Sequence, residues 1–285
     1  LNVLFRAMAR GERIFQARDW DEQIHEPASP IALPSRIRGK IEFRQVSFSY
    51  EPGNPILQDV SFIVPPGEKL AIVGPTGSGK STLIRLLGRF YDFPDGMLFL
   101  DDVDINHLHS RDVRSRVGVV LQDFHIFSGT ILDNIRLGDP TITRDIAVAA
   151  AKTVNAHGFI SAQRDGYDTL LQERGSNLSQ GERQLLAFAR VLAADPEVLV
   201  LDEATASIDT ETELLIQDGL EKLMTDRTAI LIAHRLQTIQ QADKVLVLQS
   251  GEVIEYGSQQ ELLELKGLYH TLHELQFQDL KTVPG

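Results

Sequence analysis

A short apolar stretch of this chain runs directly into a glycine-rich loop and then into a segment with helical periodicity. Residues 69–73 read KLAIV, residues 74–81 read GPTGSGKS, and residues 80–90 repeat apolar positions at helical spacing. The loop fits the pattern GxxxxGK[ST] in the strand, loop and helix setting that this pattern requires. Its glycines let backbone amides turn toward a phosphate, and the following helix presents its positive amino-terminal end. The sequence therefore predicts an α/β fold with a phosphate-binding loop.

The loop is expected to hold the phosphates of a nucleotide. Lys80 would reach the β and γ phosphates, and the Ser81 hydroxyl would coordinate Mg²⁺. The alternative is a glycine turn that caps a helix, with Lys80 solvated. The residues expected to contact the nucleotide are Gly74, Pro75, Thr76, Gly77, Ser78, Gly79, Lys80, Ser81 and Thr82.

A second run, VLVLDEATASID at residues 198–209, places two adjacent carboxylates after an apolar strand. Open α/β sheets carry ligand chemistry at the carboxyl ends of their strands. With a phosphate loop upstream, Asp202 is the natural Mg²⁺ partner and Glu203 the candidate base that polarises attacking water. An ordinary acidic turn, with Glu203 merely solvated, is the alternative.

Two more polar residues follow predicted strands. Gln122 ends the apolar stretch 117–121, and His234 follows the stretch 228–233. Each residue alone is more often an ordinary polar side chain. Because the carboxyl ends of parallel strands meet at one edge of a sheet, we expect both to lie near Asp202.

Strand-like stretches alternate with helical ones along most of the chain, which favours a mostly parallel α/β core. The alternation of residues 41–50 slips in phase once, which indicates a β-bulge. Between residues 123 and 194 strand signals vanish and helix-like runs such as 143–154 take over, so we expect a helical insert. The predicted strands cover residues 41–50, 60–64, 69–73, 97–100, 117–121, 198–201, 228–233 and 244–248.

The first 38 residues differ from the rest. Residues 1–26 repeat apolar positions at helical spacing among Arg and Glu, and residues 26–34, EPASPIALP, carry three prolines. A helix followed by a linker is the natural interpretation. The chain begins at Leu1 rather than at Met, which suggests a fragment or a processed chain.

Composition narrows the function classes. The formal net charge of −12 over 285 residues argues against a nucleic-acid surface, which needs a basic stripe. Zero Cys excludes disulfides and thiolate metal sites, and the two closely spaced histidine pairs do not specify zinc. No apolar stretch approaches the roughly 18 to 20 residues that span a bilayer, so we expect the chain as given to be soluble.

Residues 177–190, NLSQGERQLLAFAR, begin with the pattern of a capping box. Ser179 can cap the helix, and Glu182 lies three positions later. Gly181 would let the backbone approach a ligand closely. From the residues alone, a well-capped helix that packs into the core is the favoured interpretation.

Taken together, these residues resemble the nucleotide-binding domain of ABC transporters, over about residues 39–278. The motifs follow the family order along the chain, and the segments LQDFHIFSGTILDNIRLG, Glu173–Gly175 and RAMARGERIF are similar to the exporter branch. The matching motifs are Tyr50, GPTGSGKS, Gln122, LSQGERQ, VLVLDE, Ser207 to Asp209, and His234.

The resemblance implies a P-loop NTPase (RecA-like) core with a mostly parallel sheet, an antiparallel β subdomain and a helical subdomain at about residues 123–194. Residues 1–38 would be a helical extension and linker from a transmembrane domain, and residues 39–285 the ATP-binding domain. The domain would lie at the cytoplasmic face of a membrane and bind ATP and Mg²⁺. Its partners would be that transmembrane domain and a second nucleotide-binding domain, not nucleic acid.

The family forms a head-to-tail dimer that encloses two ATP molecules. By resemblance, Tyr50 would stack on adenine, and Gln122 would contact Mg²⁺ beside Asp202. His234 would help position Glu203 and water. Ser179 and Gly181 would reach the γ phosphate of the opposite site, and Asp209 would lie at the dimer interface.

This chain departs from the family at the signature, where LSQGE replaces LSGGQ. A negative charge on Glu182 near an opposing phosphate is electrostatically unfavourable unless the positive end of the helix dipole offsets it. An ATP-binding regulatory or weakly hydrolysing half of a heterodimeric exporter is therefore the alternative. A DNA-repair ATPase of the same superfamily would need a long heptad insertion between Ser81 and Ser179, and the sequence has none.

Overall fold

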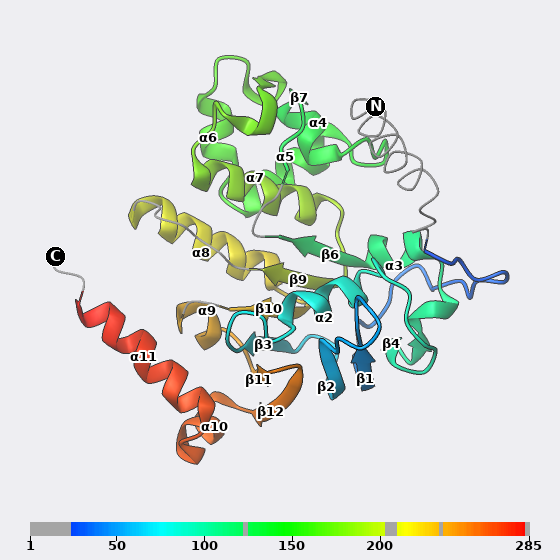
Figure 1. The fold of residues 1–285 in the computed structure, drawn as a ribbon. Coiled ribbons are helices and arrows are strands. Elements are labelled where there is room, and N and C mark those ends of the chain that lie inside the picture. Colours follow the sequence, from blue (N-terminus) through cyan, green and yellow to red (C-terminus); the bar gives the residue numbers. More distant parts are fainter. Residues whose placement is uncertain (1–23, 122–124, 203–209, 234–235, 283–285) are drawn as a thin grey trace, which may run out of the picture.

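The fold is α/β, built from two sheets and a lobe of helices (Figure 1). A computed structural model describes residues 24–121, 125–202, 210–233 and 236–282. Across those ranges, none of the helices combines the length and the apolar character that crossing a bilayer demands.

The main sheet has six strands in the order β12-β11-β3-β10-β9-β6. All neighbours pair in parallel except β12, which runs antiparallel to β11. The predicted parallel core is thereby confirmed, whereas β12 was missed. The strands are β3 (Lys69–Val73), β6 (Val117–Val120), β9 (Val198–Asp202), β10 (Thr228–Ile232), β11 (Lys244–Gln249) and β12 (Glu252–Gly257).

Both faces of the parallel strands are buried, which explains their almost uninterrupted apolar sequences. In β3, Leu70 and Ile72 join the core that contains α2 (Lys80–Leu87). Ala71 and Val73 point to the opposite face and join the core that contains α7 (Gln180–Ala193). The main sheet is therefore covered on both sides, and only its edges and strand ends are open to ligands.

The second sheet is antiparallel, with strand order β2-β1-β4-β5. Its register shifts after Phe43 and again after Val46, which confirms the predicted bulge in this strand. The strand expected at residues 97–100 exists, but it pairs with β1 in this sheet instead of joining the parallel core. The strands are β1 (Ile41–Phe48), β2 (Leu57–Val64), β4 (Leu98–Leu100) and β5 (Val103–Asp104).

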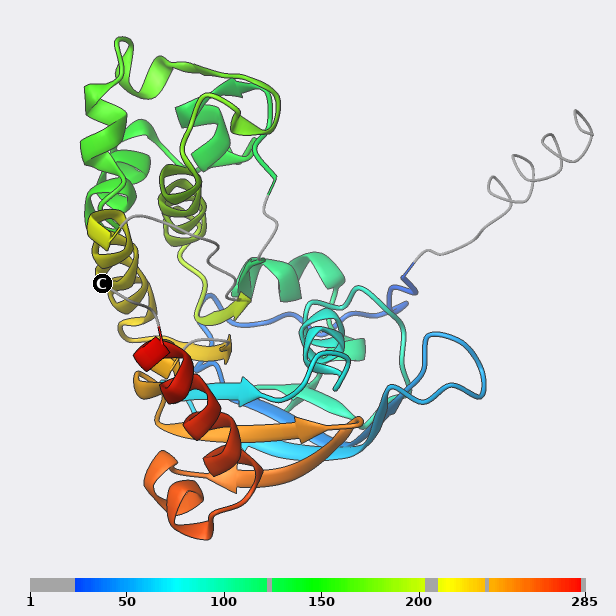
Figure 2. The same ribbon diagram turned by 60° about the vertical axis from the view of Figure 1, so that its left-hand side comes forward.

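The predicted helical insert is a separate lobe, drawn in green in Figures 1 and 2, at the opposite end of the molecule from α10 and α11. Contrary to expectation it contains a short antiparallel ladder, β7 (Gly129–Thr130) with β8 (Leu170–Leu171). Strands of two residues carry no periodicity, so they were not predictable from the sequence. The lobe helices are α4 (Ile131–Arg136), α5 (Arg144–Thr153), α6 (His157–Ala162) and α7.

Side-chain caps mark the starts of two lobe helices. The Thr143 hydroxyl accepts from the amide of Ile146 at the start of α5, and Thr130 forms a capping box with Asp133 in α4. The remaining helices complete the core and the two ends of the domain. They are α3 (Ser110–Arg116), α8 (Thr210–Met224), α9 (Leu236–Gln240), α10 (Gln259–Leu265) and α11 (Leu268–Thr282), with short 3₁₀ turns at Ile105–His107, Gly166–Asp168 and Glu173–Gly175.

Residues 24–40 contain neither helix nor strand, as their prolines indicated. The segment nevertheless lies on the domain: the amide of Ile31 donates to the carbonyl of His107 (2.8 Å), and Ile37 is buried. Most of the helix expected over residues 1–26 falls outside the described residues. Residues 24–26 are not helical.

A glycine at residue 251 is required where the two sheets meet the phosphate loop. Gly251 has a φ of +84°, and an added Cβ would lie 2.4 Å from the Ile56 carbonyl oxygen. We expect Gly251→Ala to lower the free energy of unfolding by about 3 kcal/mol, because backbone must shift in addition to the left-handed strain. Gly53→Ala is the matched control, with a φ of +86° and no atom within 4 Å. Equal losses for the two variants in urea unfolding would contradict the close approach.

Candidate functional site

The loop after β3 has a backbone that only glycine supports. Gly74, Gly77 and Gly79 have φ values of +150°, +80° and +106°. A Cβ on Gly74 would lie 2.0 Å from the Leu248 carbonyl oxygen, and one on Gly79 would lie 2.7 Å from Leu57 Cδ2. The predicted strand, loop and helix are confirmed, and each glycine has a steric reason.

Lys80 fills the centre of this loop. Its Nζ donates to the carbonyl oxygens of Gly74 (2.8 Å) and Pro75 (2.9 Å), and the residue is buried. Burial lowers the pKa of the Lys80 ammonium, while the negative charge of Asp202 acts in the opposite direction. The loop therefore presents a desolvated cation, which interacts with an anion more strongly than a solvated one does.

The helix that follows the loop begins without the usual cap. Gly79 offers no side chain to the first amides of α2, and the first turn has no acidic residue. By contrast, Thr130, Thr143, Ser179 and Ser258 each cap their own helices. The amino-terminal amides and the dipole of α2 are left for an external acceptor, the usual arrangement for anion binding.

Asp202 lies where the sequence placed it, at the carboxyl end of β9. It is opposite Ile232 of β10, and its charge acts on Lys80. Glu203, His234, Gln122 and Asp209 lie outside the described residues. The strands that lead to the first three are neighbours, because β6 and β10 flank β9 in the sheet. Topology therefore brings the carboxyl ends of these three strands to one edge of the sheet.

Tyr50 stands over the phosphate-loop helix. Its hydroxyl forms a hydrogen bond with Thr82 Oγ1 (3.0 Å) and accepts one from Arg85 Nη1 (3.2 Å). Phe48 and Tyr91 contact its ring edge to face, with centroids 5.1 Å and 5.0 Å away. The residue is 39% exposed, so part of an aromatic side chain is accessible beside the loop. Sequence reasoning found Tyr50 but missed Arg85 and Tyr91, because no motif spacing joins them.

The capping box at Ser179 is confirmed. The amide of Glu182 donates to Ser179 Oγ (3.2 Å), and the amide of Ser179 donates to Glu182 Oε2 (2.8 Å). The helix terminus thus engages the carboxylate that replaces the family glutamine. Gly181 has a packing reason, since a Cβ there would lie 2.1 Å from Thr212 Cγ2 of α8.

Ser179 and the phosphate loop belong to different parts of this chain. The loop packs against β2 and β11, through Leu57 and Leu248. Ser179 lies in the helical lobe, on a groove of about 570 Å³ that Lys152 and His157 also line. Figure 1 shows α7 in the lobe and α2 among the sheets. The phosphate loop and Ser179 therefore lie in different parts of one chain.

A buried node ties α7 to the segment that follows Gln122. Asn134 is fully buried; its side chain accepts from the Phe127 amide (2.9 Å) and from Arg190 Nη2 (3.2 Å). Arg190 also donates to the carbonyl oxygens of His125 (3.0 Å) and Asn134 (2.9 Å). Burial lowers the pKa of the Arg190 guanidinium to about 10. This node was not predictable from the sequence, because its residues are far apart in the chain.

A carboxylate and histidine grouping near β5 is a further feature that the sequence did not indicate. Side-chain atoms of Asp95, Asp104 and His107 lie within 4.8 Å of one another. Both Asp104 oxygens already accept backbone amides, those of Gly96 and Asn106. This grouping has a structural use.

Comparison with known proteins identifies the family. The sequence profile described as "ABC transporter" matches residues 57–206, more than half of the chain. The chain belongs to the ABC transporter family. Its fold is the P-loop NTPase fold of the ABC ATP-binding domain, and such domains bind ATP and are ATPases. The predicted resemblance, fold class and ATPase activity are confirmed at this level.

The relatives are of the exporter type. An ABC transporter ATP-binding protein of Bacillus subtilis is 47% identical over 97% of this chain, and a fatty acid ABC transporter ATP-binding/permease protein of Mycobacterium bovis is 44% identical over 95%. The structure of a bacterial Atm1-family ABC exporter with ATP bound has a TM-score of 0.83 and 39% identity over 95% of the chain. The chain spans 46% and 42% of the two relatives and 47% of the chain of known structure.

The node around Asn134 generates a stability prediction for this ABC domain. Asn134→Ala should lower the free energy of unfolding by about 3 kcal/mol, because it leaves the Phe127 amide without its acceptor and removes one acceptor from the guanidinium of Arg190. Asn54→Ala, at an exposed position, is the control and should change it by less than about 0.5 kcal/mol. Chemical denaturation measures both. A loss for Asn134→Ala as small as that of the control would show that the node contributes no stability.

Proposed function

We propose that this chain is the ATP-hydrolysing engine of an ABC exporter, working as a head-to-tail dimer around two ATP molecules. One observation carries the proposal. The phosphate half-site, with its uncapped helix and buried Lys80, and the Ser179 half-site lie in different parts of one chain. Two chains in opposite orientation would complete two sites by pairing unlike halves.

Within one chain, the loop residues 74–82 hold the triphosphate and Tyr50 stacks on adenine. Lys80 exchanges its two carbonyl acceptors for phosphate oxygens. Its desolvated positive charge then has an anionic partner. Arg85 and Thr82 fix the ring of Tyr50 through its hydroxyl. Asp209 and the partner's copies of the signature residues, including Ser179 and Gly181, close the site.

The oxygen donors near the loop suit Mg²⁺, which prefers carboxylates and hydroxyls together with phosphate oxygens. Asp202 and Ser81 would hold it, with Gln122 as a further contact. Bound there, the ion would neutralise charge on the phosphates during transfer. Asp202 meets this role because its charge already acts on Lys80 at the same end of the loop.

Hydrolysis requires a base that takes a proton from the attacking water. Glu203 directly follows β9 and is the residue we assign to this task, with His234 orienting Glu203 and the water. The backbone amides at the start of α2 and Lys80 stabilise the charge that spreads over the γ phosphate. A regulatory, weakly hydrolysing half is less favoured, because Glu203 and His234 are both present and the Ser179 amide engages Glu182.

The physiological partners follow from the relatives. Several are ATP-binding/permease proteins, so we infer a transmembrane domain joined through residues 1–38 to an ATP-binding domain at residues 39–285. The ATP-binding domain would work at the cytoplasmic face of the membrane. Closure of the dimer on ATP and its reopening after hydrolysis would drive transport. No feature of the chain indicates a nucleic-acid partner.

The role of Glu203 is directly testable. Glu203→Gln should keep ATP binding, slow turnover by at least about 100-fold and accumulate an ATP-bound dimer, because the base is lost while the binding groups stay. Phosphate release and size-exclusion chromatography measure the two effects. Glu211→Gln, an exposed carboxylate at the start of α8, should behave as the wild type. Turnover that survives in Glu203→Gln would exclude Glu203 as the principal base.

A mixing experiment tests the shared site. Lys80→Ala should abolish ATP binding, whereas Ser179→Arg should leave binding to the monomer intact, and both should be inactive alone. Mixed in equal amounts, they should recover about a quarter of wild-type turnover, since half the dimers are mixed and each has one intact site of two. Loss of monomer binding in Ser179→Arg, or a mixture that stays inactive and never dimerises with ATP, would contradict the proposal.

A further inference from the structure

The segment predicted to be a linker contacts the ATP-binding domain at several points along its length. We call residues 24–40 the strap. Its middle passes α3, where Arg116 Nη2 donates to the Pro34 carbonyl oxygen (3.1 Å). Further along, Arg36 pairs with Asp195, and the Ile37 amide donates to Glu197 Oε1 (3.3 Å). The strap is therefore part of the domain surface and carries contacts at defined points.

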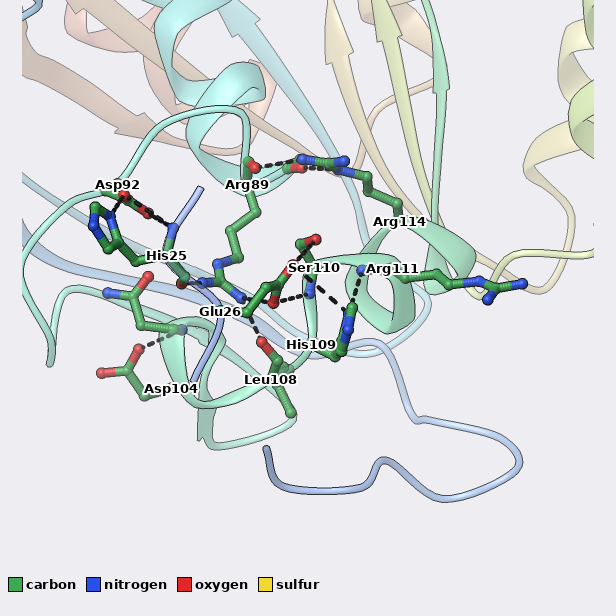
Figure 3. A network of polar contacts seen from close by, with 12 residues as sticks. His25, Glu26, Arg89, Asp92, Asp104, Leu108, His109, Ser110, Arg111 and Arg114 are labelled. Atoms are coloured by element: carbon green, nitrogen blue, oxygen red, sulfur yellow. Dashed lines mark hydrogen bonds and ion pairs between the residues drawn. The ribbon is translucent and has the colours of Figure 1, made fainter. Parts of the chain in front are cut away.

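Three side chains meet where the strap first touches the domain, and we call Glu26, Arg89 and Ser110 the Glu26 joint (Figure 3). Arg89 is only 1% exposed; it donates to the His25 carbonyl oxygen (2.6 Å) and to that of Leu108, and approaches Glu26 Oε2 (3.4 Å). Glu26 accepts from both the amide (3.0 Å) and the hydroxyl of Ser110. The joint thus connects the strap to two elements of the domain.

One of those elements is the phosphate-loop helix. α2 starts at Lys80, extends for eight residues and has Gly88 as its C-cap, so Arg89 comes directly after it. The Arg89 amide donates to the Leu86 carbonyl oxygen (2.9 Å). Arg114 of α3 donates to the carbonyl oxygens of Gly88 (3.1 Å) and Arg89 (2.8 Å). The helix is about 12 Å long, so the joint lies one short rigid element away from the loop.

Breaking the salt bridge between Glu26 and Arg89 costs free energy. Within the described part of the chain, Glu26 forms the one salt bridge of Arg89, whose guanidinium is buried. A buried cation that loses its carboxylate is strongly destabilising. Burial raises the pKa of Glu26, but the hydrogen bonds from Ser110 and the charges of His109 and Arg89 outweigh it, so the net pKa is lowered. Glu26 is therefore ionised at neutral pH and holds the strap in place.

We propose that the Glu26 joint couples the occupancy of the phosphate loop to the docking of the strap, and thereby to the chain that precedes residue 24. This inference rests on the proposed function, because it takes ATP as the ligand of the loop. When ATP replaces the carbonyl acceptors of Lys80, it stabilises the start of α2 and suppresses local opening of that helix. Arg89 carries this stabilisation to Glu26 and the His25 carbonyl. Glu26 is thus a positioning residue.

Hydrogen exchange of the strap measures this coupling in the chain as it stands. In Mg²⁺-free buffer, saturating ATP should slow exchange of residues 24–31 at least threefold in the wild type. Glu26→Gln should lose this response and, since coupling is reciprocal, bind ATP about threefold more weakly. Asp195→Asn is the matched control: it weakens the contact between Arg36 of the strap and Asp195 of the domain without touching α2, and should keep the ATP response and the affinity.

The wild-type measurement decides the proposal without any variant, so a folding defect in Glu26→Gln does not obscure it. Tight ATP binding with identical strap exchange in the presence and absence of ATP would overturn the joint as a coupling element and leave the proposed function intact. A wild type that does not bind ATP would overturn the proposed function, and this inference with it. An equal loss of response in Asp195→Asn would show general loosening of the strap and would also overturn the role of Glu26.

Discussion

The parallel pairing of β3, β10 and β9 is the constraint on which the rest of this structure depends. Because these strands are buried on both faces, their only open chemistry is at their ends. Pairing in one direction puts the phosphate loop after β3 and Asp202 after β9 at the same edge, where the carboxylate charge acts on Lys80. The loop, the start of α2 and the Asp202 carboxylate would separate if one of these strands ran the other way.

The proposed ATP site at this edge is incomplete within one chain, and this shapes the proposed mechanism. Ser179 belongs to a helical lobe that contacts the sheets through α7 and α8, with a packed glycine at the crossing. The Arg190 and Asn134 node fixes the segment after Gln122 to that helix. The strap is similarly fixed to the far end of α2. The phosphate loop is thus one short helix away from the strap.

Features carried by neighbouring residues were predictable. The phosphate loop, the capping box at Ser179, and the strand that ends in Asp202 each depend on a few consecutive positions. Features made by distant residues were not. Arg85 and Tyr91 contact Tyr50 from distant positions in the chain. Strands β7 and β8 are too short to show periodicity. Strand 98–100 belongs to the antiparallel sheet because it pairs with β1.

By itself, the sequence determined the family, the α/β class and the chemistry of the loop, because glycine conformations, caps and apolar periods are local properties of the chain. Only the tertiary structure decided that Lys80 is desolvated inside its loop, that Gly181 is needed for helix packing, and that a proline-rich segment is fastened at Glu26. The reason is physical: burial, charge compensation and close packing depend on which distant residues meet, and a linear pattern does not record those meetings.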